Sequence, residues 1–207
     1  MITILGGYNM EEFLALIKAR HSTRAYANQP VAKEDIVKVL EAGRWAPSAF
    51  NKQPWKFLVV ESEEGRKRLL QAITGDVEET KKRFAGFTGQ VAPYLQGVPV
   101  FIVVVTDPQM KASLPAHRQG VCADKLYYTS ASFPVQNMML MAEALGLSTV
   151  CFTPASDDWA QAYYREALGF AAPQEALYIL PLGYAAQGAG ERSEELRLGL
   201  EQIVCWK

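Results

Sequence analysis

Residues 98–106 (VPVFIVVVT) constrain the fold more than any other segment of the chain. Gly97 precedes this run and Asp107-Pro108 follows it, so turn-forming residues bound it on both sides. The run is rich in β-branched residues and presents no polar face. A strand of this kind must be covered by protein on both faces, which predicts the central strand of a sheet that lies between helices.

The other segments predict an α+β fold around this strand. Apolar residues at helical spacing, together with capping and helix-ending residues, define the helices, and short apolar runs define the strands. The expected helices are 9–20, 34–45, 63 to about 73, about 121–145 and about 158–168, and the further expected strands are 55–61, 149–152 and 176–182. We therefore expect a central mixed β-sheet flanked by helices. No repeat or low-complexity linker divides residues 1–207, which are expected to form a single domain.

Two segments have a less regular pattern. Residues 74–97 contain the basic cluster Lys81-Lys82-Arg83 and are expected to be mobile or lid-like. After Arg197, the C-terminal tail alternates apolar and polar residues, which is typical of a strand. Because this strand has no obvious local partner, we expect it to pair with another subunit.

Composition excludes several classes of function. With 21 Lys+Arg against 22 Asp+Glu and a pI near 6.2, no positive field favours nucleic acid as a partner. The longest apolar run is far shorter than the roughly 20 residues that span a bilayer, and the first residues lack the basic start of a signal peptide. The 3 widely spaced cysteines fit a reducing compartment, so a cytoplasmic location is expected. The spacing of His21 and His117 predicts no metal site.

The cluster 20–24 (RHSTR) places two guanidinium groups and two hydroxyl groups at the end of the first expected helix. Guanidinium groups match phosphate oxygens in geometry, and hydroxyl groups donate to the same oxygens. Two arginines in a polar turn are more often solvated surface, so this cluster alone leaves both interpretations open.

Residues 46–55 (APSAFNKQPW) combine two prolines with Ser48, Asn51 and Gln53. These polar side chains suit hydrogen bonds to a heterocycle that carries carbonyl groups and ring nitrogens. A plain connection from helix to strand explains the same residues equally well.

In their order and separation, these segments resemble the successive signatures of the FMN-dependent nitroreductase family. The resemblance extends from about residue 11 to residue 204, and no single motif carries it. Its motifs are 20–26 (RHSTRAY), 46–48 (APS) with Asn51 and 53–55 (QPW), Gln136-Asn137, 144–147 (ALGL) and 182–184 (LGY).

The resemblance implies a nitroreductase-like fold whose C-terminal strand is exchanged between the subunits of a homodimer, with FMN bound at the interface. It implies reduction of FMN by NADH or NADPH and reoxidation by a nitroaromatic compound, a quinone or a similar small molecule, with hydride transfer at flavin N5. No catalytic side chain is implied, because the flavin carries the chemistry. Two alternatives remain open: a specialised relative, such as a dehalogenase or a dehydrogenase, and a flavin-binding protein without turnover.

The resemblance also assigns the cofactor-binding residues of one subunit. Arg20, Ser22 and Arg197 would hold the FMN phosphate. Arg24 would lie toward the ribityl chain and the N1/O2 edge of the ring, where a cation stabilises the charge added by reduction. His21 belongs to the same cluster, and we expect a backbone or packing role for it, because its cationic form is disfavoured beside Arg20 and Arg24.

Four further residues, Pro47, Ser48, Ala49 and Asn51, would reach the flavin from the other subunit. Thr153 and Pro154 would pass the flavin edge, with the backbone N–H of Thr153 as a donor to N5. Some family members carry a second basic residue before the central strand. The nearest counterparts here are Gln90 and Pro93, so FMN contacts from that segment are unassigned.

Overall fold

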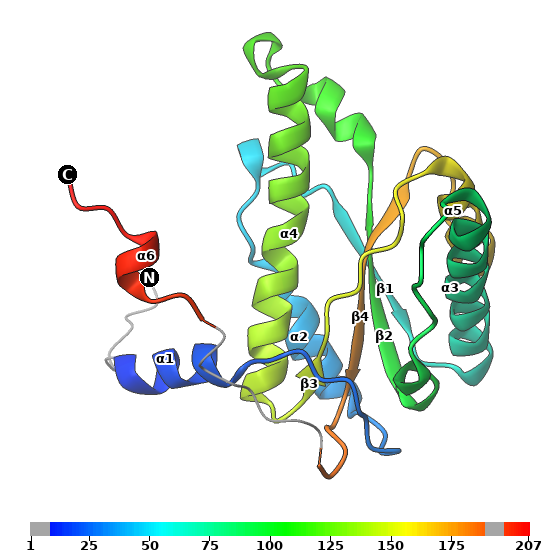
Figure 1. The fold of residues 1–207 in the computed structure, drawn as a ribbon. Helices are drawn as coiled ribbons and strands as arrows, with labels where there is room; N and C mark the ends of the chain where they lie inside the picture. Colours follow the sequence, from blue (N-terminus) through cyan, green and yellow to red (C-terminus); the bar gives the residue numbers. More distant parts are fainter. Residues whose placement is uncertain (1–8, 189–196) are drawn as a thin grey trace.

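A four-stranded sheet forms the centre of the computed structural model, which describes residues 9–188 and 197–207 (Figure 1). The strands are β1 (Trp55–Val60), β2 (Val100–Thr106), β3 (Ser148–Thr149) and β4 (Glu175–Gly183), in the order β1-β2-β4-β3. Every residue of β2 is buried, and β2 lies between β1 and β4. The predicted central strand is therefore confirmed.

The ladders of the sheet are antiparallel. A parallel pairing occurs in the described residues at one isolated bridge, between Ser22 and Thr149. The expected mixed sheet is thus mixed only at this bridge, where the connection between the first two helices passes beside β3.

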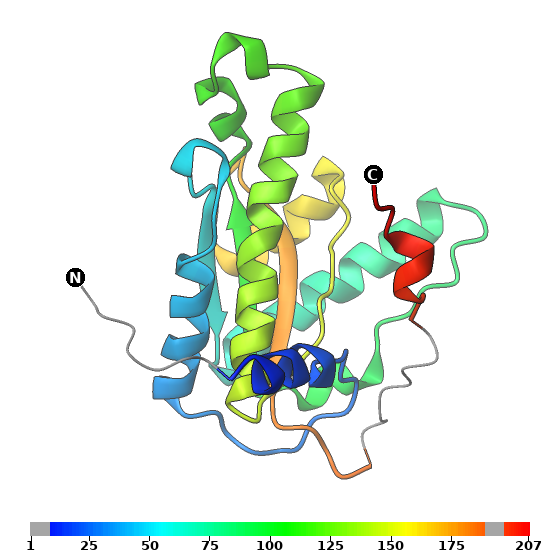
Figure 2. The ribbon, with the colours of Figure 1, turned by 90° about the vertical axis from the view of Figure 1, so that its left-hand side faces the viewer.

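Helices cover both faces of the sheet. They are α1 (Met10–Ala19), α2 (Lys33–Arg44), α3 (Glu63–Arg83), α4 (Val121–Ala144), α5 (Asp158–Leu168) and α6 (Leu200–Ile203). Figures 1 and 2 show α2 and α4 on one side of the sheet and α3 and α5 on the other.

Alternate residues of β2 face these two helical layers. Ile102 and Val104 pack with residues of α2 and α4, whereas Phe101 and Val103 pack with residues of α3 and α5. Each such side chain is almost completely removed from water, which contributes about 1.5–3 kcal/mol per side chain. The predicted burial of β2 on both faces is therefore confirmed. This burial is the main contribution of β2 to the fold.

Local signals fix several helix ends as the sequence predicts. The Asn9 side chain caps α1 by accepting hydrogen bonds from the backbone N–H groups of Glu11 and Glu12, at 3.1 and 3.3 Å. Gly169 ends α5 in the left-handed conformation, with φ of 74°.

The expected end of the third helix near Ile73 is wrong, because α3 continues to Arg83. Ion pairs such as Lys81–Glu78 and Arg83–Glu79, both at 2.9 Å, support the added turns. Residues 93–97 form a 3₁₀ turn (η2, Pro93–Gly97) with Leu95 buried. Much of the segment expected to be mobile or lid-like is therefore regular structure.

The expected C-terminal strand is not formed within the described chain. Residues 200–203 form the short helix α6 instead, and the backbone N–H of Gly199 donates to the Gln202 side chain at 2.8 Å. Figure 1 shows this segment extending away from the sheet. A strand needs a neighbour for its backbone hydrogen bonds, and without one the tail closes a local helical turn.

Candidate functional site

The predicted phosphate cluster begins where α1 ends. Arg20 is the C-terminal cap of α1, and the chain then runs beside β3, where the Thr23 N–H donates to the Thr149 carbonyl at 3.0 Å. Thr23 is buried, at 2% exposure, while Ser22 is half-buried and Arg24 is exposed. Because side chains alternate along an extended segment, Ser22 and Arg24 lie on the side opposite Thr23.

His21 has a local role in this cluster. Its Nδ1 lies 3.0 Å from the Ala19 carbonyl oxygen, and its Nε2 lies 3.4 Å from the Thr23 hydroxyl oxygen. The ring therefore contacts the backbone just before the cluster and the buried threonine inside it, as expected for a backbone or packing role.

Tyr26 lies close to Arg24 and has a buried hydroxyl group without a hydrogen-bond partner among the described residues. Its ring is 6.1 Å from that of Tyr94. Burial raises the pKa of Tyr26 well above its ordinary value of 10.0, Tyr94 acts in the same direction, and Arg24 opposes both. A buried hydroxyl without a partner costs folding free energy.

We expect Tyr26→Phe to stabilise the protein by about 1 kcal/mol, because it removes this unsatisfied hydroxyl and keeps the ring. At this chain length, the melting temperature should rise by about 2–4 °C. Thermal unfolding of the two proteins followed by circular dichroism measures the difference. A lower melting temperature in the variant would show that the hydroxyl has a stabilising partner.

The loop 47–54 has a defined and unusual backbone. Ala49–Asn51 form a 3₁₀ turn, η1. Three non-glycine residues in the loop have positive φ: Phe50 (52°), Asn51 (53°) and Gln53 (47°). Such backbone strain is concentrated at functional sites in proteins. The strained residues lie within and beside the predicted flavin-contacting segment.

Two serines hold this loop in place. The Ser130 hydroxyl of α4 accepts from the Ala49 N–H at 3.0 Å, and the Ser48 hydroxyl accepts from the Gln53 N–H at 2.9 Å. The Gln53 side chain also donates to the Asn51 side-chain oxygen at 3.1 Å. Two of the predicted site residues, Ser48 and Asn51, therefore shape the loop itself.

The β3–α5 loop, residues 150–157, contains Thr153 and Pro154 and is called the Thr153 loop below. Just before them, Phe152 pairs with Ile179 of β4 through two backbone hydrogen bonds of 2.9 and 2.8 Å. Pro154 is buried, whereas Thr153 is exposed. The Thr153 backbone N–H makes no hydrogen bond to another described residue. This donor is available to a molecule outside the chain.

The structure brings the predicted residues together in two groups. Arg20, Ser22 and Arg24 lie beside β3, which leads into the Thr153 loop, at the C-terminal end of α4. Residues 47–51 lie beside Ser130, which is about 20 Å from that end at about 1.5 Å per helical residue. Figures 1 and 2 show α1 crossing the lower end of α4 and the segment after α2 beside its upper half. Arg197 is exposed at the start of the C-terminal tail.

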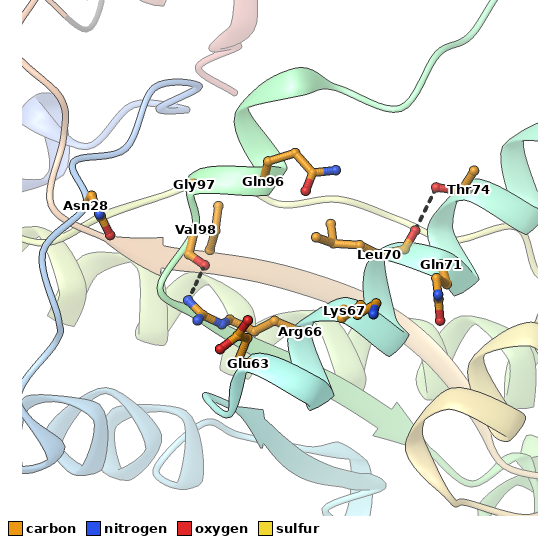
Figure 3. Close-up of a pocket in the computed structure, with 10 residues that line it drawn as sticks. All are labelled: Asn28, Glu63, Arg66, Lys67, Leu70, Gln71, Thr74, Gln96, Gly97 and Val98. Atoms are coloured by element: carbon orange, nitrogen blue, oxygen red, sulfur yellow. Dashed lines mark hydrogen bonds between the residues drawn. The ribbon is translucent and has the colours of Figure 1, made fainter.

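A cavity of about 600 Å³ lies elsewhere, between α3 and the residues that precede β2 (Figure 3). Arg66 lines it and donates to the carbonyl oxygens of Val98 and Pro99 at 3.2 and 3.3 Å. None of the predicted site residues lines this cavity. A smaller cavity of about 320 Å³ adjoins the strained loop at Gln53.

Neither a metal centre nor a membrane span is found in the described residues. They contain no group of three or more potential metal-ligating side chains. No helix among residues 9–188 and 197–207 combines the length and apolar character needed to cross a membrane.

Sequence reasoning missed Gln161, a buried polar residue of α5 that contacts the Thr153 loop. Its exposure is 2%, and its side-chain amide donates to the Ala155 carbonyl at 2.8 Å. The sequence signal that could have indicated its burial is its position between Ala160 and Tyr164, which lie on the buried face of α5.

Comparison with known proteins shows the family to which the chain belongs. Residues 17–184 match the model of the nitroreductase family, and the chain belongs to that family. It is 30% identical over 175 residues to a candidate NADH dehydrogenase/NAD(P)H nitroreductase of Archaeoglobus fulgidus, covering 84% of this chain and 86% of that protein.

The chain is also similar to an iodotyrosine deiodinase of Rattus norvegicus, with 28% identity over 193 residues. That match covers 86% of this chain but 64% of the deiodinase. Among solved structures, the FMN-dependent nitroreductase of Clostridium difficile R20291 superposes with a TM-score of 0.70 at 22% identity, covering 93% of this chain and 98% of that one. This likeness shows the shared fold.

Proposed function

We propose that the protein is an FMN-dependent NAD(P)H oxidoreductase that reduces nitroaromatic compounds, quinones or similar small molecules. The observation that carries this proposal is the exposed side of the Arg20–Arg24 segment, which pairs with β3, the strand that leads into the loop whose Thr153 N–H makes no hydrogen bond to another described residue. Membership of the nitroreductase family supports it.

The donor set fits the two ends of FMN. Guanidinium and hydroxyl groups, as in Arg20, Ser22 and Arg197, suit a phosphate dianion. A fixed cation at Arg24 and the free N–H of Thr153 suit the polar edge of a ring that becomes more electron-rich on reduction.

The role of the protein is then to bind, orient and polarise. FMN, when bound, supplies the two-electron chemistry between NAD(P)H and the acceptor. Arg20, Ser22 and Arg197 would bind the phosphate, Arg24 would stabilise negative charge near N1 and O2, and the Thr153 N–H would donate toward N5. Solvent supplies protons, so the chain needs no acid–base pair.

A homodimer completes this proposed site. Residues 47–51 lie beside the middle of α4 and the Arg20–Arg24 segment lies at its C-terminal end, so a two-fold axis across α4 would bring one group against the partner's other group. Exposed apolar side chains on α1, η1 and α4 support such contact. They are Phe13, Leu14 and Ile17 of α1, Phe50 of η1, and Val121, Tyr128 and Phe133 of α4. The exposed C-terminal tail would be exchanged in the same dimer.

The first experiment is the visible absorbance spectrum of the purified protein before and after anaerobic addition of NADH or NADPH. We expect a bound-flavin spectrum that one of the two donors bleaches. A protein that neither contains nor takes up FMN would contradict the proposal. Bound flavin that neither donor reduces would favour a flavin-binding protein without turnover.

Dehalogenation is the second candidate reaction, because several similar proteins are iodotyrosine deiodinases. The reduced protein can be mixed anaerobically with a nitroaromatic compound, a quinone or an iodinated tyrosine. Rapid return of the flavin absorbance with the first two supports the proposed reaction. Reoxidation only by the iodinated tyrosine, with release of iodide, would replace it by reductive dehalogenation.

A further inference from the structure

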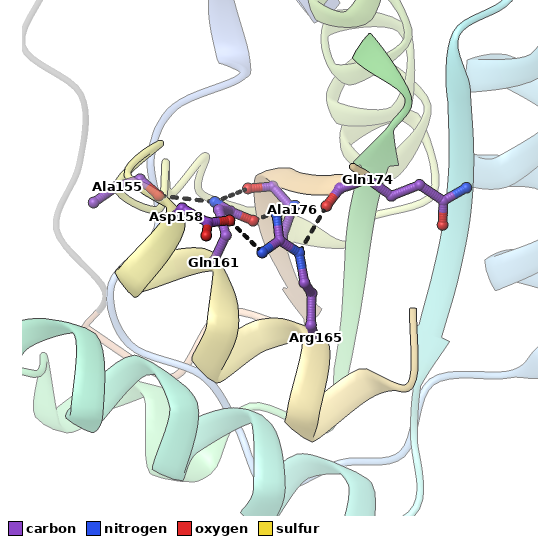
Figure 4. Close-up of polar contacts among 6 residues, drawn as sticks. All are labelled: Ala155, Asp158, Gln161, Arg165, Gln174 and Ala176. Atoms are coloured by element: carbon purple, nitrogen blue, oxygen red, sulfur yellow. Dashed lines mark hydrogen bonds and ion pairs between the residues drawn. The ribbon is translucent and has the colours of Figure 1, made fainter. Parts of the chain in front are cut away.

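A buried polar cluster joins the Thr153 loop to α5 and to the start of β4 (Figure 4). Gln161 is its centre. The Gln161 side-chain N–H groups donate to the carbonyl oxygens of Ala155 and Ala176 at 2.8 and 3.1 Å, and its side-chain oxygen accepts from the Ala176 N–H at 2.7 Å. The amide of this one side chain thus holds two separate backbone segments.

The Thr153 loop is consequently held on both sides of Thr153 and Pro154. Phe152 is fixed to β4 by its bridge with Ile179, and Ala155 is fixed by Gln161. Thr153 and Pro154 lie between these two attachments. With the backbone fixed on either side, the direction of the free Thr153 N–H is restricted.

A second residue of α5 makes comparable contacts without touching the loop. Arg165 donates to the Gln174 carbonyl at 3.1 Å and to the Asp158 carboxylate at 2.6 Å. Figure 4 shows both contacts on the helix that also presents Gln161. Arg165 therefore ties α5 to the segment before β4, and its replacement separates general loosening of α5 from release of the loop.

We propose that Gln161 is a positioning residue that aims the Thr153 N–H at the reacting edge of the flavin. This inference rests on the proposed FMN-dependent function. With FMN bound, the N–H would donate to N5 of the oxidised flavin, which is a good acceptor, and would bond more weakly to the reduced flavin, whose N5 carries hydrogen. A well-aimed donor therefore activates N5 toward hydride and disfavours the reduced form relative to a loop without this donor.

Gln161→Leu tests the proposal, because leucine has a similar size and makes none of the three hydrogen bonds. We expect two changes that a merely structural residue would not produce together. The rate of flavin reduction by NAD(P)H should fall roughly tenfold to a hundredfold. The flavin midpoint potential, measured against a reference dye, should nevertheless become more positive. FMN affinity should stay nearly unchanged, because the phosphate is held elsewhere.

Arg165→Met is the matched control. It should lower thermal stability, yet leave both the reduction rate and the potential close to those of the original protein. Hydrogen exchange of the apoprotein gives a readout that does not need flavin. Exchange in peptides covering residues 150–157 should accelerate in Gln161→Leu and not in Arg165→Met.

Gln161→Glu keeps the test usable if the leucine variant does not fold. The glutamate carboxylate still accepts from the Ala176 N–H but can donate to neither the Ala155 nor the Ala176 carbonyl, so the loop is released while α5 keeps one hydrogen bond to β4. We expect the same slower reduction and more positive potential. If a folded Gln161 variant that binds FMN matches Arg165→Met in rate and potential, the positioning role is wrong. If the original protein binds no FMN, the proposed function itself fails, which is a distinct result.

Discussion

Removing two guanidinium groups, in the double variant Arg20→Ala/Arg197→Ala, is expected to weaken FMN binding at least about 100-fold while the protein keeps its fold and its proposed dimeric state. Hydrogen bonds to charged groups contribute about 1.5–3 kcal/mol each, and each 1.4 kcal/mol is tenfold in affinity. Arg20 is half-buried and Arg197 is exposed, so their loss leaves the buried core unchanged. Quenching of FMN fluorescence on titration with apoprotein measures the affinity, and size-exclusion chromatography measures the dimer.

The matched control is the double variant Arg44→Ala/Arg68→Ala, which removes two exposed guanidinium groups from α2 and α3. Arg68 lies 3.6 Å from Glu64, and exposed pairs of this kind contribute little to stability. This control should bind FMN like the original protein. Equal affinity in the Arg20/Arg197 variant would show that the phosphate is bound elsewhere.

Alkaline pH should unfold the protein steeply, because three tyrosine hydroxyl groups are shielded from water. Burial raises the pKa of Tyr26, Tyr127 and Tyr164 well above the ordinary value of 10.0, and it is the largest cause at each. Below about pH 10, the folded and unfolded chains both keep these protons, so these groups add no pH dependence. Above it, the unfolded chain loses protons that the folded chain keeps, and stability falls as pH rises. The expected slope is about 1.4 kcal/mol per pH unit for each tyrosine, or about 4 kcal/mol for three.

Urea unfolding at a series of pH values around 10 measures this slope, and the ultraviolet absorbance of tyrosinate reports ionisation. Tyr26→Phe is the most direct test, because the Tyr26 hydroxyl has no partner in the described chain to disturb. Its slope should be shallower by about 1.4 kcal/mol per pH unit. Ionisation of the buried tyrosines before unfolding begins would contradict the prediction.

The central part of the fold is predictable because its signals are local or strongly apolar. The run of β2, the Asn9 cap and the Gly169 stop each act within a few residues. The second half of α3 is not predictable in this way, since its apolar pattern ends near Ile73. Its buried Asp76 accepts a hydrogen bond of 2.7 Å from Tyr164, and no sequence pattern connects residues so far apart along the chain.

The predicted site likewise has parts that local sequence signals predict and parts that depend on contacts distant in the chain. The Arg20–Arg24 cluster is visible as a motif, but its place beside Thr149 depends on sheet pairing. The positive φ of Phe50 and Asn51 cannot be predicted from the sequence, because neither residue is a glycine. Tertiary contacts such as the Ala49–Ser130 hydrogen bond impose this conformation. Gln161 resembles any polar helix residue until the loop opposite is known. The C-terminal tail forms a helical turn in the isolated chain, and its exchange in a dimer stays a prediction.

The separation of the two predicted FMN-contacting groups by more than half the length of α4 has a thermodynamic consequence. On the proposed arrangement, one flavin contacts two chains, so cofactor affinity and dimer affinity are linked and reciprocal. FMN would tighten the dimer by the same factor by which dimerisation tightens FMN. Dilution would then release flavin from the original protein, and apoprotein would dissociate at concentrations where the loaded protein does not.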